Sequence, residues 1–153
     1  MLQDEISSQV KEEFSHFAAE TRQDLVNQLD SGLNSLRSTI EHEAASLRAK
    51  VYELEYHRLC SEAKDWLESG VVNNMFRTGC KLLEIAILED NAFHVGRALD
   101  VILRSLKNHA TPHVTGISEL SKLLESLSSE HKLDVDIIRD MLRQVRSGLA
   151  INH

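Results

Sequence analysis

Histidines, cysteines and neighbouring carboxylates are the side chains of this sequence with which chemistry could begin. His109 and His113 lie four residues apart, a spacing at which a helix can offer two imidazoles to one metal ion. Pro112 stands between them and is expected to begin a helix, which leaves His109 in the preceding loop with no third ligand fixed nearby. We therefore predict no metal site and no cofactor.

The other reactive groups form no recognisable catalytic pattern. Cys60 and Cys80 lack a CxxC spacing, and a nucleophilic thiol would also need a base and a cleft, so structural thiols are expected. Adjacent carboxylates such as Glu12 and Glu13 are typical of solvated helix faces. The sequence accordingly predicts no enzyme activity, no catalytic residue and no small-molecule substrate.

Cysteine usage and hydropathy predict a cytoplasmic protein without a membrane anchor. Two cysteines without a disulfide framework are typical of a reducing compartment. Residues 1–5 lack the basic start of a signal peptide. No run of about eighteen apolar residues, the length needed to cross a bilayer, occurs in the sequence.

The net charge of −7 is unevenly distributed along the chain. Residues 1–68 hold 7 Lys/Arg against 14 Asp/Glu, whereas the rest is balanced, so the acidic excess disfavours nucleic-acid binding. One basic stripe, formed by Arg139, Arg143 and Arg146 on the expected last helix, could contact an acidic partner. Three aspartates on the same helix dilute this stripe, and an ordinary exposed face is the simpler interpretation.

Apolar residues recur at intervals of three and four over the first third of the chain, where no proline occurs. The spacing 4-4-3 repeats, which gives an eleven-residue period and a nearly straight or slightly right-handed apolar stripe on a helix. We call this stripe the seam and predict that it is an oligomer or partner interface. Its members are Ile6, Val10, Phe14, Phe17, Leu25, Leu29, Leu33, Leu36, Ile40, Leu47, Val51 and Leu54.

A helix over residues 3–68 would be roughly 100 Å long, whereas the remaining residues would fold to a body about 30 Å across. The body cannot cover such a stripe, so the seam must meet a second copy, a partner helix or its own other half. A turn at residues 30–32 (Asp-Ser-Gly) would allow the last arrangement. His16, His42 and His57 beside the seam could make assembly sensitive to pH, or could simply be tolerated there.

Gly70 is suited to close the long helix, which divides the sequence into residues 1–69 and 70–153. Four shorter helices follow: one over 71–89, a second capped by Asp90-Asn91, a third opened by Thr111-Pro112, and a last one with Asp134 as N-cap, Leu133 stapled onto Ile138 and Gly148 as its stop. Tyr52, Tyr56 and Trp66 are expected to pack the end of the long helix onto this bundle.

The predicted fold class is therefore all-α, with a long coiled-coil-like helix followed by a small bundle of four short antiparallel helices. The predicted function is that of a non-enzymatic assembly or adaptor protein. Its seam would oligomerise or bind a partner helix, and the bundle would present a second binding surface. The alternative is a compact helical regulatory or inhibitory module that acts on a protein partner, with the first helix folded back as a hairpin.

Overall fold

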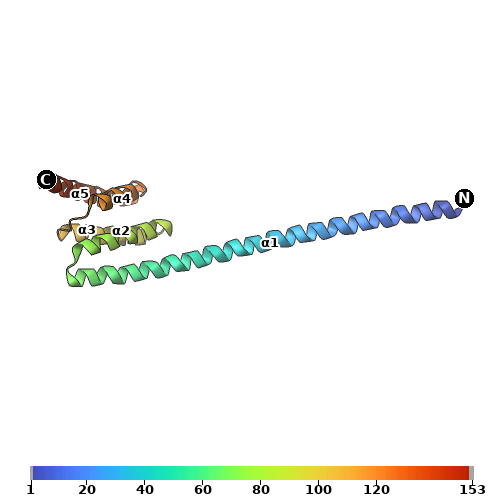
Figure 1. The fold of residues 1–153 in the computed structure, drawn as a ribbon, viewed down its shortest axis with the longest axis horizontal. Coiled ribbons are helices and arrows are strands. Elements are labelled where there is room, and N and C mark those ends of the chain that lie inside the picture. The colour runs from blue at the N-terminus through green and yellow to red at the C-terminus, as the bar shows by residue number, and fades with distance from the viewer. Residues whose placement is uncertain (1, 152–153) are drawn as a thin grey trace. The chain divides into compact units, whose positions relative to one another are not determined.

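The computed structural model of the protein describes residues 2–151 and the side chains of residues 2–148 (Figure 1). It confirms the all-α fold, since the described residues form five α-helices, one short 3₁₀ helix and no strand. The elements are α1 (Leu2–Ser69), α2 (Val72–Leu88), α3 (Ala92–Lys107), α4 (Val114–Glu125), the 3₁₀ helix η1 (Ser129–His131) and α5 (Lys132–Ile151). Their contacts divide the chain into two units, residues 1–47 and residues 48–153.

The first unit contains only the first part of helix α1, up to residue 47. Ala18 is half-buried, and every other described side chain of this unit is exposed. The helix runs through Asp30, Ser31 and Gly32 without a turn, so the structure contains no hairpin there. A single glycine inside a helix costs only about 1 kcal/mol relative to alanine, which the flanking helical turns can accommodate.

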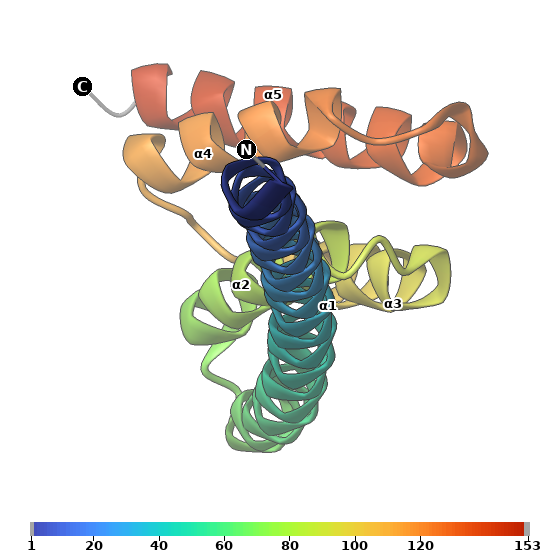
Figure 2. The same ribbon diagram turned by 90° about the vertical axis from the view of Figure 1, so that its right-hand side faces the viewer.

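The second unit contains the last part of α1 and all of the shorter helices. Helices α2 and α3 form one hairpin, α4 and α5 form another, and the two hairpins stack through contacts of α3 with α5 and of α2 with α4 (Figure 2). The end of α1 packs on the other side of the α2–α3 hairpin. The core is built from aliphatic residues of every layer, among them Leu59, Leu83, Leu99, Ile117 and Ile138.

Two helix boundaries lie where the sequence places them. Helix α1 ends before Gly70, whose φ of +72° is the left-handed conformation that glycine adopts readily, and the Val71 N–H donates to the Trp66 carbonyl at 3.0 Å. Helix α3 is capped by Asn91, whose side chain accepts a hydrogen bond from the His94 backbone N–H at 3.1 Å.

The predicted start of α4 was wrong. The Thr111 hydroxyl does not cap the helix, because Thr111 is held by Asn73: its backbone N–H donates to Asn73 Oδ1 at 2.7 Å. Pro112 remains in the loop and is buried. The cap is instead His113, whose Nδ1 accepts from the Thr115 backbone N–H at 3.2 Å.

The predicted boundaries of α5 were also wrong. The helix begins at Lys132 directly after η1, so Asp134 lies within the first helical turn and is not the N-cap. Leu133 is 74% exposed and forms no staple with the buried Ile138. Gly148 does not stop the helix, which continues to Ile151. The 3₁₀ turn supplies a helical start upstream of the position that the aspartate marks.

Candidate interaction surface

The seam is exposed along its whole length. Its twelve side chains are between 55% and 72% accessible, and no described part of the chain covers them. Large aliphatic and aromatic side chains in a continuous row of this kind are unusual on the surface of an isolated protein. The arrangement resembles the contact stripe of a coiled-coil helix, which becomes buried when a second helix packs along it.

The last part of α1 has two apolar faces, and both are visible within the second unit. Val51 and Leu54 are 60% and 71% exposed, whereas Tyr56 and Ala63 are buried in the core. Because an α-helix advances roughly 100° per residue, Tyr56 lies about 200° and Ala63 about 180° around the helix from Leu54. The bundle therefore packs on the face opposite the seam, and seam residues at this level remain free.

Sequence reasoning missed two exposed apolar side chains of α1 that adjoin the seam. Leu2 is 76% exposed and lies four residues before Ile6, so it extends the seam by one position. Val26, which is 46% exposed, directly follows Leu25 and widens the seam on one side. The spacing from Ile6 would have identified Leu2, whereas Val26 does not belong to the three-and-four pattern.

The histidines beside the seam are solvent-exposed. His16 Nε2 lies 3.2 Å from Glu20 Oε1, and His57 Nε2 lies 3.9 Å from Glu53 Oε1, each at a spacing of four residues. His42 is exposed as well. Ion pairs between side chains this exposed contribute little to stability. The pH sensitivity of assembly stays a prediction.

A cluster of polar side chains connects α1 to α2. Arg58 contacts both Glu55 at 2.6 Å and Glu62 at 3.0 Å. Glu62 also accepts hydrogen bonds from Trp66 Nε1 at 3.3 Å and from the Thr78 hydroxyl at 3.2 Å. These bonds, led by that from Trp66, hold the pKa of Glu62 below its usual value. Trp66 and Tyr52 are half-buried, so Tyr56 is the one of the three predicted packing aromatics that is buried in the core.

A second polar cluster lies inside the bundle around Tyr56. The His94 ring stacks on the Tyr56 ring with 3.7 Å between centroids, and His94 Nδ1 lies 3.2 Å from Glu89 Oε2. Tyr56 Oη and Glu89 Oε1 are buried, with no hydrogen-bond partner among the described residues. Burial is the main cause that raises the pKa of Tyr56, so its phenol stays protonated and acts as a packing group.

The reactive residues considered from the sequence are not assembled into a catalytic or metal centre. His109 lies in a loop with φ +69° and His113 caps α4, so the two imidazoles do not share a helix. Cys60 and Cys80 are free thiols, and burial raises the pKa of Cys80 to about 12, which keeps it protonated. Among residues 2–151 no group of three or more His, Cys, Asp or Glu side chains could hold a metal ion.

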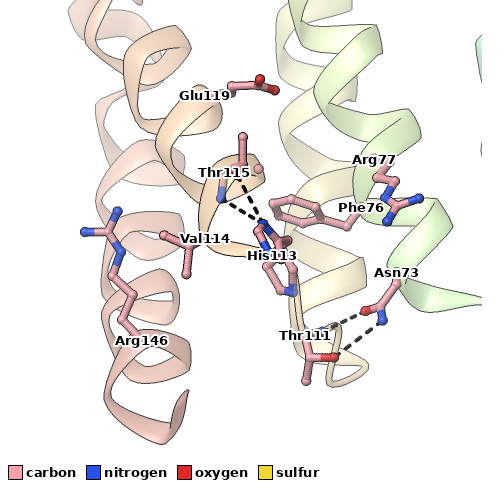
Figure 3. A pocket seen from close by; sticks show the side chains of 11 residues that line it. Asn73, Phe76, Arg77, Thr111, His113, Val114, Thr115, Glu119 and Arg146 are labelled. Carbon is pink, nitrogen blue, oxygen red and sulfur yellow. Dashed lines mark hydrogen bonds between the residues drawn. The ribbon is translucent and has the colours of Figure 1, made fainter. Parts of the chain in front are cut away.

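The bundle carries one large pocket, of about 940 Å³, between α2, the loop before α4, and the helices α4 and α5 (Figure 3). The Asn73–Thr111 and His113–Thr115 hydrogen bonds order its wall. Its charged lining residues come from three helices and include cations on both sides. The lining residues are Asn73, Phe76, Arg77, Thr111, Pro112, His113, Val114, Thr115, Gly116, Glu119 and Arg146.

The predicted basic stripe is partly brought to this pocket. Arg146 lines it, and together with Arg139 and Arg143 it also lines a smaller hollow of about 140 Å³ against α4. Arg143 pairs with Asp140 at 3.2 Å on an exposed face, as the diluting aspartates suggest. Arg146 therefore faces both hollows, whereas the other two arginines line only the smaller one.

Comparison of the chain with protein-family models, curated proteins and solved structures gives no match. The interpretation of the surfaces above therefore depends on their geometry alone. No helix formed by residues 2–151 is long and apolar enough to span a membrane.

Proposed function

We propose that this protein is a non-enzymatic assembly protein that associates with a second copy of itself through the seam and presents its C-terminal bundle as a second binding surface. The observation that carries the proposal is the continuous exposed seam on α1, together with the packing of the bundle on the opposite face of that helix. The bundle leaves Val51 and Leu54 uncovered, so assembly requires no rearrangement of the core.

The size of the seam supports a stable complex. Full burial of a Leu, Ile, Val or Phe side chain contributes about 1.5–3 kcal/mol, and the seam side chains still expose more than half of their surface. A second helix packed along the seam would bury most of that remainder on both copies. The summed gain exceeds the association cost of about 4–15 kcal/mol, which must be overcome before any affinity is seen.

The second surface is the pocket between α2, α4 and α5. Its apolar floor around Phe76 and its two cations, Arg77 and Arg146, which outnumber its one anion Glu119, suit a protein segment with apolar and acidic side chains. The two free thiols favour a reducing compartment, so we place this role in the cytoplasm. In this proposal the seam determines the assembly state, and the bundle determines what the assembly holds.

The test is the mass of the full chain in solution. Sedimentation equilibrium over a range of about 1–100 µM should show a mass above that of the 17.3 kDa monomer, with a monomer fraction that rises on dilution. A monomer mass throughout this range would refute the proposed self-association.

A further inference from the structure

Charged residues beside the seam are sorted by sign onto its two sides. Thr21 and Ala44 continue the three-and-four spacing of the seam, and we call these two residues and the seam residues the in-phase positions. Between in-phase positions four apart, every charged residue next to one of them can be assigned to a side. One side, which we call the basic flank, holds the residues that directly follow an in-phase position and lie three residues before the next in-phase position. Its cations are Lys11, Arg22, Arg37 and Arg48.

The other side, which we call the acidic flank, holds the residues that directly precede an in-phase position and lie three residues after the previous in-phase position. Its anions are Glu13, Glu20, Asp24 and Glu43, all of them exposed like the cations of the basic flank. At roughly 100° per residue the two flanks lie about 80° to either side of the seam. Asp30 and Glu41 on the basic flank and Lys50 on the acidic flank are exceptions to the sorting.

Orientation decides which flanks meet when two such helices pack. In a parallel pair, the basic flank of each helix faces the acidic flank of its partner, whereas in an antiparallel pair like flanks face each other. An antiparallel pair that sets Ile6 beside Val51 would bring Lys11 near Arg48, Arg22 near Arg37, and Glu13 near Glu43. Each of these contacts would occur twice, and each is repulsive.

Parallel pairing converts the same residues into opposite-charge neighbours. Glu43 precedes Arg48 by five residues, the spacing at which acidic and basic flanks of parallel coiled-coil helices form interchain pairs. At an offset of two residues, Lys11 meets Glu13 of the other copy, and Arg22 meets Glu20 and Asp24. The exceptions Glu41 and Lys50 meet Glu43 and Arg48, so opposite-charge contacts outnumber like-charge ones. The flanks are therefore complementary to themselves, which identifies a second copy of this chain as the partner that the seam fits.

We propose that α1 pairs in parallel and in register with α1 of a second copy. This inference rests on the proposed self-association and adds its orientation. Because the chains run in the same direction, the bundles of both copies follow the same end of the paired helices.

The experiment uses cysteine substitutions in the full chain under a glutathione redox buffer, where disulfides form according to proximity. Parallel register places position 6 beside position 6, so Ile6→Cys alone should give a covalent dimer. The antiparallel arrangement would instead link Ile6→Cys to Val51→Cys in a mixture of the two variants. The unsubstituted chain, with Cys60 and Cys80, is the control for linkage through the native thiols.

Preferential linkage of Ile6→Cys to itself supports the parallel pair. Preferential linkage in the mixture, or a dimer mass without linkage at position 6, overturns the orientation but leaves self-association intact. A monomer mass for the unsubstituted chain overturns the proposed function, and the orientation with it. The mass measurement thus separates the two failures.

A charge reversal gives a second test of opposite sign. In the parallel pair Glu43→Arg meets Arg48 of the other copy at two sites and should weaken association roughly tenfold, whereas adding Arg48→Glu should restore it. In the antiparallel pair Glu43→Arg would face Glu13 and strengthen association. A stronger dimer from the single variant would therefore overturn the proposal.

Discussion

The seam predicts a large and position-specific effect of charge on assembly. Leu29 and Leu36 lie in the middle part of the seam and are 65% and 56% exposed in the free chain. In the assembled state each would lose about 1 kcal/mol or more of apolar burial when replaced by aspartate, because full burial of a leucine contributes about 1.5–3 kcal/mol. In the variant Leu29→Asp/Leu36→Asp this loss occurs at four positions of a dimer.

The summed loss is about 4–6 kcal/mol before the cost of desolvating the new carboxylates, which corresponds to at least about a 10³-fold rise in Kd. Sedimentation equilibrium of the full chain measures this change directly. The double variant should be monomeric at concentrations at which the unsubstituted chain is assembled.

The matched control is Ser31→Asp/Ser38→Asp. Each of these exposed serines lies two residues after one of the leucines, which is about 200° around the helix, so the control adds the same charge on the face away from the seam. Its assembly should match that of the unsubstituted chain. The reasoning fails if the leucine variant keeps the wild-type mass, or if the serine variant dissociates to the same extent.

Three further predictions concern the bundle. Gly79→Ala should lower the free energy of unfolding by about 1–2 kcal/mol, because its Cβ would lie 2.8 Å from the buried Ile102 side chain. The control Gly96→Ala has open space and should stabilise α3 by about 0.5–1 kcal/mol. Urea unfolding measures both changes, and equal stability of the two variants would contradict the close approach of α2 and α3. Tyr56→Phe should leave stability unchanged or raise it, because the hydroxyl it removes is buried without a partner, and a loss above about 1 kcal/mol in the same assay would show that the hydroxyl is bonded. The pKa of Glu62 is lower in the folded than in the unfolded chain, so its contribution to the free energy of unfolding is present above the unfolded pKa of about 4.5 and is lost as the pH falls through the folded pKa. Glu62→Gln should therefore flatten the acid limb of a plot of stability against pH. An unchanged limb would assign the loss of stability in acid to other groups.

The sequence predicts those features that local spacing determines. Helix type, the order of the helices, the close of α1 at Gly70 and the Asn91 cap all follow from patterns within a few residues. The starts of α4 and α5 could not be found in this way. Asn73 takes the backbone N–H of Thr111 from a distant part of the chain, and such competition leaves no local signal.

The same limit applies to the surfaces. The seam was visible because one helix carries all of its members at a regular spacing. The stacked pair of Tyr56 and His94 joins α1 to α3, and the pocket collects residues from α2 to α5. Both depend on tertiary packing that brings separate segments together, which a periodicity along one chain cannot describe.

The two opposed apolar faces at the end of α1 make the helix a point of thermodynamic linkage. Leu54 belongs to the assembly surface and Tyr56 to the folded core, and a single helical turn fixes both. A partner that binds the bundle and makes this turn more rigid would lower the entropic cost of ordering the seam, and would thereby tighten assembly without touching it. By reciprocity, assembly would tighten that partner's binding by the same factor.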